Sequence, residues 1–356
     1  FMIKEIYEQP QAIKNTLNGR VAKGEKIVLD KIADGDLKDI SRVFIVACGT
    51  AYHAGLVGKT AIERLSGIPV DVDIASEFRY RNPILDKNTL VMVISQSGET
   101  ADTLAALRLA KQHGCKTFAI TNVVGSSVSR EADFVFYTYA GPEIAVASTK
   151  AYITQLIALY IFALYMAQDR NYVSKEMIEN IKSELLLLPE KVKKALETDA
   201  LTKEIAEKIC VETDIFYLGR GLDYAVAMEG SLKLKEISYI HSEPYAGGEL
   251  KHGPIALIEK GTVVIALNTN AELRGKMDSN IKEVVTRGAR IVEILPDNFE
   301  NAGEGCDEII TVPATEAILS PVTAVVPLQL LSYHVAIAKG CNVDKPRNLA
   351  KSVTVE

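Results

Sequence analysis

An alternation of short strand-like runs with longer helical segments constrains this fold more than any other feature of the sequence. The runs are rich in β-branched and apolar residues, and amphipathic segments with helical spacing separate them. This alternation is typical of a parallel sheet whose crossover helices cover both faces. The runs that predict strands are RVFIVACG (42–49), VDVDIA (70–75), TLVMVIS (89–95), KTFAIT (116–121), DFVFYT (133–138), DIFYLGRG (214–221), TVVIALNT (262–269), ARIVEILP (289–296) and EIITVP (308–313).

The predicted strands form two sets that line up with each other. RVFIVACGT parallels DIFYLGRGL, with Gly49 opposite Gly221, and HGCKTFAIT parallels RGARIVEIL, with Gly114 opposite Gly288. TLVMVISQSGET likewise parallels TVVIALNTNAEL. Two copies of one α/β unit explain these matches. The general likeness of all doubly wound folds is the alternative explanation.

The predicted fold class is therefore α/β, with two tandem doubly wound parallel-sheet subdomains, each a three-layer α/β/α arrangement. We expect the first subdomain at residues 1–172 and the second at 173–340, with a C-terminal tail at 341–356. The region from about 145 to 205 is rich in Leu, Lys and Glu and predicts helices. Its most apolar part, LIALYIFALYMA (156–167), is too short to span a bilayer and predicts a buried helix.

Composition indicates a soluble globular protein rather than a partner of nucleic acid or membrane. Of the 356 residues, 48% are hydrophobic and 24% are charged, and the formal net charge is −6. A nucleic-acid interface would need a clustered basic face, and the sequence has none. The N-terminal segment carries acidic residues and no apolar core, so we expect no signal peptide there.

Cysteine and histidine spacing argues against disulfides, a protein-held metal and a cofactor site. The cysteines lack a C-x-x-C pair, and the histidines lack an H-x-x-x-H spacing. Scattered reduced thiols favour a cytoplasmic location. The cysteines are Cys48, Cys115, Cys210, Cys306 and Cys341.

The loop SQSGET (95–100) is the strongest candidate binding site. It follows a predicted buried strand and precedes the helical pattern ADTLAALRLAKQHG. A helix N-terminus at this edge of a parallel sheet favours an anion, and Ser95, Ser97 and Thr100 add hydroxyl donors. The lysine of a nucleotide P-loop is missing, so a phosphate monoester on a small metabolite is expected. Ordinary helix capping by Ser97 or Thr100 is the alternative.

The turn after the first strand should lie beside this loop, because adjacent parallel strands end at the same edge. Gly49 and Thr50 occupy that turn. Cys48 precedes them, and we interpret it as a packing residue rather than a nucleophile, because no histidine is paired with it locally.

These motifs resemble a known family. SQSGET after a strand is similar to the phosphate loop of sugar isomerase (SIS) domains. The wider set resembles the isomerase half of the glucosamine-6-phosphate synthases, and the likeness runs from about residue 3 to the C-terminus. This set comprises KEIYEQP, CGTAYHAG, SQSGETADT, VASTKAY, KLKEISYIHSE, ELKHGP and DKPRNLAKSVTVE.

The resemblance implies a homodimer that binds fructose 6-phosphate and forms glucosamine 6-phosphate, or glucose 6-phosphate when no nitrogen donor takes part. The ammonia would come from a glutaminase domain that this sequence does not contain. By the same likeness, the substrate-binding residues are Cys48, Gly49, Thr50, Ser95, Gln96, Ser97, Thr100, Val146, Ala147 and Ser148. One departure is Ala51, where the family usually has serine, and this loss of a hydroxyl predicts modestly weaker binding.

The resemblance also assigns the catalytic roles. Glu236 would move a proton between neighbouring carbons, with Lys233 one helical turn before it. His252, supplied by the neighbouring subunit, would open the sugar ring, and Lys351 in the tail over the active site would form a Schiff base. From spacing alone, Lys233 and Glu236 would be a surface ion pair, and a terminal lysine would be a solvated charge. The apolar tail residues Leu349, Ala350, Val353 and Val355 favour a docked tail.

Two other functions fit parts of the pattern. A sugar-amine phosphate deaminase or deglycase would use a similar loop and base, but the KEIYEQP start argues against it. A non-catalytic sugar-phosphate sensor would need the loop but has no use for Glu236, His252 and Lys351 together.

Overall fold

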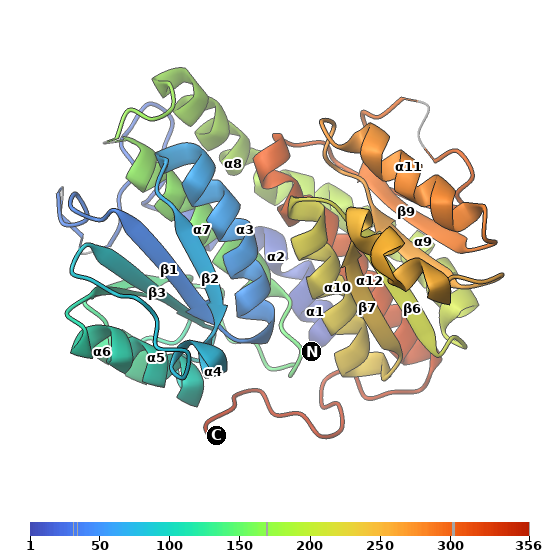
Figure 1. Ribbon diagram of the computed structural model, residues 1–356, viewed down its shortest axis with the longest axis horizontal. Coiled ribbons are helices and arrows are strands. Elements are labelled where there is room, and N and C mark those ends of the chain that lie inside the picture. The colour runs from blue at the N-terminus through green and yellow to red at the C-terminus, as the bar shows by residue number, and fades with distance from the viewer. Residues whose placement is uncertain (31, 34, 169, 301–302, 356) are drawn as a thin grey trace. The chain divides into compact units, whose positions relative to one another are not determined.

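Two parallel sheets organise the protein, as the repeated strand pattern predicts (Figure 1). The computed structural model describes residues 1–30, 32–33, 35–168, 170–300 and 303–355. The first five-stranded sheet has the order β2-β1-β3-β4-β5, and the second has the matching order β7-β6-β8-β9-β10. The strands are β1 (Arg42–Ala47), β2 (Val70–Ile74), β3 (Thr89–Ser95), β4 (Lys116–Thr121), β5 (Phe134–Tyr137), β6 (Asp214–Gly219), β7 (His241–Ala246), β8 (Val263–Leu267), β9 (Arg290–Pro296) and β10 (Glu308–Val312).

Helices connect the strands within each unit. The α-helices are α1 (Met2–Tyr7), α2 (Gln9–Leu17), α3 (Gly49–Ser66), α4 (Ala75–Phe78), α5 (Ala101–Gln112), α6 (Ser127–Glu131), α7 (Lys150–Gln168), α8 (Lys175–Ala195), α9 (Asp199–Ile209), α10 (Leu222–Ser238), α11 (Arg274–Val285) and α12 (Ser320–Ala338). Short 3-10 helices are η1 (Leu196–Thr198), η2 (Gly247–His252), η3 (Pro254–Leu257) and η4 (Ala317–Leu319).

Among the residues that the structure describes, β7 is the one strand that the sequence pattern missed. Its sequence, HSEPYA, is polar and contains Pro244. It lies at the edge of the second sheet, where it pairs with β6 alone. An edge strand tolerates proline and polar side chains because one of its sides has no ladder to complete. For this reason neither apolar alternation nor β-branched enrichment marks it.

Side-chain alternation along the first sheet places helices on both of its faces. Phe44 and Val46 on β1 pack in one cluster with residues of α4, α5 and α6. Ile45 points the other way and meets Gly55 of α3. Phe118 of β4 packs edge-to-face on Phe162 of α7, with ring centroids 5.0 Å apart. The result is the predicted three-layer α/β/α arrangement.

The second sheet follows the same plan. Phe216 and Leu218 of β6 pack in a cluster with Met277 and Ile281 of α11. Tyr217 between them faces the opposite layer, where it lies next to Gly230 of α10. Helix α10 in turn packs against α12 and β7. Each sheet therefore has its own core.

The chain divides into two compact units, one around each sheet. The first-sheet unit comprises Gln11–Glu143, Lys150–Leu187 and residues 350–355, and the second-sheet unit comprises Phe1–Pro10, Ile144–Thr149 and Leu188–Leu349. Residues 1–10 and 144–149 thus group with the second sheet. The reason is local packing, since α1 lies against α12 and the Glu5 carboxylate accepts the N–H of Ile144 at 2.5 Å.

Two long apolar helices pack inside these units. Lys150–Gln168 and Ala317–Ala338 are long and apolar enough to span a membrane, but 94% and 78% of their apolar windows are buried within the fold. The prediction of a buried helix at 156–167 is therefore confirmed. Burial of this extent is typical of core helices.

The duplicated glycines adopt equivalent backbone conformations. Gly49 and Gly221 follow β1 and β6 with φ of +53° and +57°, and Gly114 and Gly288 precede β4 and β9 with φ of +72° and +87°. Positive φ is strained for residues with a side chain. These backbone requirements explain why the glycines recur in both sets of strands.

Close packing of α3 on α7 predicts a cost for Gly58→Ala. A Cβ at Gly58 would lie 2.6 Å from Leu159 Cδ2, so α7 must shift or Leu159 must change rotamer. We expect the free energy of unfolding to fall by about 1–3 kcal/mol, measured by chemical denaturation. Gly275→Ala is the control, because a Cβ there meets no atom within 4 Å. Equal stability of the two variants would contradict this packing.

Candidate active site

The SQSGET loop forms a polar turn at the carboxyl end of β3. The Ser95 hydroxyl accepts the N–H of Gly98 at 3.0 Å and lies 3.0 Å from the Thr100 hydroxyl. Ser97 Oγ accepts the N–H of Glu99 at 3.2 Å. Thr100 occupies the N-cap position of α5, but its side chain makes no capping hydrogen bond. Simple helix capping by Thr100 is therefore wrong as an explanation of these hydroxyls.

Gly98 lets the loop close against α6. Its φ is +67°, and a Cβ there would lie 2.1 Å from Ser126 Oγ. The neighbouring Glu99 turns towards α6, where its carboxylate accepts the N–H of Ser127 at 2.8 Å and the Ser127 hydroxyl at 2.6 Å. The hydrogen bond from the Ser127 side chain lowers the pKa of Glu99. Glu99 therefore ties the loop to the first residue of α6.

The turn after β1 lies beside this loop, as predicted. Strands β1 and β3 are neighbours, and their register pairs Ala47 with Ile94, one residue before Cys48 and Ser95 respectively. Cys48 packs against the core cluster under the sheet, and burial raises the pKa of its thiol. Both observations support its interpretation as a packing residue.

The C-terminal tail lies on the loop. Ser352 Oγ is 3.0 Å from Ser97 Oγ, and the carbonyl of Val353 accepts the N–H of Ala101 at 3.1 Å. That N–H belongs to the first turn of α5, where helices have unpaired donors. The tail is therefore docked, but not for the reason that we expected. The four apolar tail residues are all exposed, and polar contacts hold the tail instead: Leu349, Ala350, Val353 and Val355.

Lys351 makes an ion pair with a carboxylate that the sequence did not reveal. Its Nζ lies 2.6 Å from Glu143 Oε2, and the Glu143 side chain is completely buried. The other oxygen of Glu143 accepts the N–H of Ala151 at the start of α7. A lone acidic residue in the apolar stretch GPEIAVA is the signal that could have identified Glu143.

A second charged cluster lies on α10 in the second-sheet unit. Lys233 Nζ is 2.5 Å from Glu236 Oε2 and 3.5 Å from Glu229 Oε1. The side chains of Lys233 and Glu229 are fully buried, whereas Glu236 is 22% exposed. The alternative of a surface ion pair is thus wrong. Spacing along the helix did not reveal Glu229, although it lies one turn before Lys233.

His252 ends the 3-10 helix η2 and is exposed to solvent in the single chain. Gly253 follows it with φ of +146°, a conformation that other residues rarely adopt. The exposed imidazole is accessible to a ligand or to another molecule.

The predicted binding segment Val146, Ala147 and Ser148 belongs to the second-sheet unit. The N–H of Val146 donates to the carbonyl of Asp344 at 3.0 Å, and the Asp344 carboxylate accepts the N–H of Met2 at 2.7 Å. Ala147 is buried and Ser148 is half-buried. The backbone hydrogen bond from Val146 thus links this segment to Asp344, which in turn holds the N-terminal residue Met2.

Each unit therefore holds its own set of the predicted residues. The first-sheet unit contains the loop, the turn after β1 and Lys351. The second-sheet unit contains Lys233, Glu236, His252 and the 146–148 segment.

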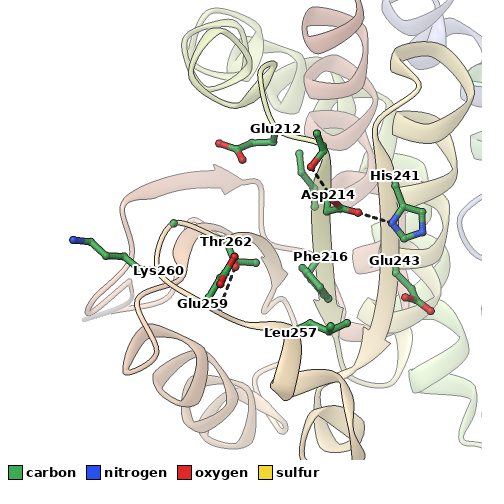
Figure 2. Close-up of a pocket in the computed structure, with 12 residues that line it drawn as sticks. Glu212, Asp214, Phe216, His241, Glu243, Leu257, Glu259, Lys260 and Thr262 are labelled. Atoms are coloured by element: carbon green, nitrogen blue, oxygen red, sulfur yellow. Dashed lines mark hydrogen bonds and ion pairs between the residues drawn. The ribbon is translucent and has the colours of Figure 1, made fainter.

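A cavity of about 590 Å³ lies at the opposite edge of the second sheet (Figure 2). It surrounds the amino ends of β6, β7 and β8, where Asp214 forms an ion pair with His241 at 2.9 Å. None of the predicted site residues lines it. Because ligands of open parallel sheets bind beyond the carboxyl ends of the strands, we do not assign the active site to this cavity.

Comparisons with known proteins agree with this organisation. The SIS domain family model matches residues 36–165 and 208–339. Glutamine–fructose-6-phosphate aminotransferase [isomerizing] from Clostridium tetani is 62% identical over 358 residues, which cover 100% of this chain and 59% of that protein. The protein of that name from Clostridium acetobutylicum is 60% identical with the same coverage. The chain thus spans 59% of the length of these relatives.

Two solved structures have the same fold over nearly their whole length. The C-terminal domain of glucosamine-fructose-6-phosphate aminotransferase from Francisella tularensis is 44% identical, with a TM-score of 0.91, and covers 97% of this chain and 98% of that one. Glucosamine-6-phosphate deaminase from Thermotoga maritima is 26% identical, with a TM-score of 0.76 and 99% coverage of both chains. The fold, the two matched segments and these similarities establish that the chain belongs to the SIS domain family and carries two copies of the domain.

Proposed function

We propose that this chain is a ketose/aldose isomerase module that binds fructose 6-phosphate. In the full-length enzyme, with ammonia from a glutaminase domain, the product would be glucosamine 6-phosphate; without a nitrogen donor it would be glucose 6-phosphate. The observation that carries the proposal is the tail on the SQSGET loop, since it brings an amine next to a predicted phosphate site. Ser352 contacts Ser97 directly, and Lys351 is the adjacent residue.

The loop suits a phosphate monoester. Hydroxyls of Ser95, Ser97 and Thr100 converge where α5 begins, and the amino end of a helix attracts an anion. The tail contacts at Ser97 and Ala101 occupy donors that a phosphate would use. Substrate binding therefore requires these tail contacts to rearrange.

Lys351 suits imine formation. Its amine must lose a proton before it attacks the C2 carbonyl of the open-chain ketose, and the Glu143 carboxylate at 2.6 Å is placed to accept that proton. The carbonyl oxygen then leaves as water. The resulting iminium makes the hydrogens on C1 more acidic.

Glu236 is the candidate base for the proton transfer. In the reaction without ammonia, water first hydrolyses the imine and returns the open-chain ketose. Glu236 would then take a proton from C1 and deliver it to C2 through an enediol, while a proton passes from the C1 hydroxyl to the C2 oxygen, which gives the aldose phosphate. The Glu236 carboxylate contacts the buried amine of Lys233 at 2.5 Å. When ammonia replaces the lysine amine, the same proton transfer gives the amino sugar.

We assign ring opening to His252 and infer that it acts across the interface of a homodimer. Its exposure in the single chain leaves the imidazole available to a partner's substrate.

We also place the protein in the cytoplasm, because its free cysteines fit a reducing compartment. A second candidate function is deamination of a sugar-amine phosphate, which the similarity to the glucosamine-6-phosphate deaminase suggests. The chain is only 26% identical to that deaminase but 62% identical to the aminotransferase, so we favour the isomerase function.

Replacement of Thr100 tests the phosphate site. Thr100→Val removes a hydroxyl that makes no helix cap, so the fold should tolerate it. A lost hydrogen bond to a charged group costs about 1.5–3 kcal/mol, so affinity for fructose 6-phosphate should fall roughly tenfold or more in calorimetry. Thr286→Val, an exposed site at the end of α11, is the control and should bind normally. Unchanged affinity in Thr100→Val would exclude this phosphate site.

Chemical trapping tests the imine. Borohydride added with fructose 6-phosphate should reduce the imine to a stable adduct on Lys351, which peptide mass spectrometry would locate. Lys351→Met should abolish the adduct, whereas Lys345→Met, in the same tail segment, should retain it. An adduct on Lys233, or no adduct at all, would contradict the proposed mechanism.

A further inference from the structure

The loop after β8 is the structural counterpart of the SQSGET loop. In the first sheet Val46 pairs with Val93, and in the second sheet Leu218 pairs with Ala266. This register makes positions 268, 269 and 270 equivalent to positions 95, 96 and 97. The second loop therefore carries Asn268, Thr269 and Asn270 where the first carries Ser95, Gln96 and Ser97.

An aspartate side chain occupies this second loop. Asp223 stands two residues after Gly221, the position that Ala51 holds after Gly49. Its carboxylate accepts the backbone N–H of Thr269 at 2.8 Å and the Thr269 hydroxyl at 2.5 Å. The backbone N–H of Asn270 also donates to it.

These contacts resemble those of a bound anion rather than those of an ion pair. Asp223 is 3% exposed, and no lysine or arginine pairs with it in the described part of the chain. Its partners are a hydroxyl and two backbone N–H groups of a loop at the carboxyl edge of a parallel sheet. Desolvation raises the pKa of Asp223 to about 6, and the hydrogen bonds from Thr269 and Asn270 oppose this rise. The group is therefore mostly ionised at pH 7 and above.

We propose that the loop after β8 is a second anion-binding loop whose anion is the chain's own Asp223 carboxylate, in the place that a sugar phosphate takes at the first loop. This inference rests on the proposed phosphate site at SQSGET. In the first copy, the equivalent residue Ala51 has no carboxylate, so no side-chain anion of that position competes with a ligand. In the second copy, the carboxylate occupies the loop permanently, so the chain should hold one phosphate rather than two.

The internal anion also anchors α10. Asp223 lies in the first turn of α10, and the Thr269 hydroxyl that donates to it lies 2.9 Å from Ser320 Oγ. Ser320 begins α12, which packs along α10. The carboxylate thus fixes the amino end of the helix that carries Glu229, Lys233 and Glu236.

Rescue by a small anion tests this inference. Asp223→Ala should lower the thermal midpoint of the full chain at pH 8 and leave a space the size of a carboxylate. Formate should enter that space and raise the midpoint of this variant by about 5 °C, at an ionic strength matched with chloride. Formate should leave the wild-type midpoint unchanged. Asp223→Asn, which fills the space without the charge, should be destabilised and should not respond to formate.

Two results would overturn the inference. One is an equal response of Asp223→Ala and wild type to formate. The other is a thermal midpoint of Asp223→Asn that equals the wild-type midpoint at pH 8. This second test does not depend on whether Asp223→Ala folds. If the proposal of a phosphate site at the SQSGET loop is wrong, Thr100→Val will bind fructose 6-phosphate with unchanged affinity. That result would not alter the formate response of Asp223→Ala.

Discussion

The need to satisfy the amino ends of the helices at the carboxyl edge of each sheet determines how the two copies are built. Every crossover helix that leaves a parallel strand begins there with N–H groups that lack helical partners. Each copy solves this with different residues. In the first, the carbonyl of Val353 in the tail accepts the first N–H of α5, beside the Ser95 and Thr100 hydroxyls. In the second, the buried carboxylate of Asp223, in the first turn of α10, accepts the N–H of Thr269 in the loop after β8.

Buried charge distinguishes the candidate catalytic groups from ordinary surface ion pairs. Lys233 is completely buried between Glu229 and Glu236, and Glu143 is completely buried against Lys351. Removing such charges from water costs several kcal/mol for each ion, unless partners compensate. Buried charges held in such pairs are candidates for a chemical role. Their placement on α10 and beside the tail fits proton transfer and amine activation.

Much of the fold could be predicted because local and long-range signals agree. Strands buried on both faces read as continuous apolar runs, so β1, β3, β4, β8 and β9 were evident. Edge position and Pro244 concealed β7, because nothing in its sequence requires a buried ladder. Glycines with positive φ, such as Gly49 and Gly221, revealed the duplication.

The candidate site was less predictable, because its contacts join residues that are far apart in the sequence. Motif likeness identified Lys351, but its partner Glu143 lies 208 residues away. Periodicity could not show that Lys233 is buried, since burial depends on how α12 and β7 pack against α10. Asp223 lies in the first turn of a helix, where acidic residues are common, so its sequence context carries no specific signal. Its role emerged from the register of β6 and β8.

The central claim is that this chain isomerises a ketose phosphate by moving a proton between C1 and C2. The most direct measurement follows fructose 6-phosphate by NMR in D₂O, without ammonium or glutamine. The account predicts glucose 6-phosphate with deuterium at C2, because a carboxylate base exchanges its proton with solvent before returning it, and no such product from Glu236→Gln. Absence of any aldose phosphate from the wild-type chain, or equal turnover by Glu236→Gln, would contradict it.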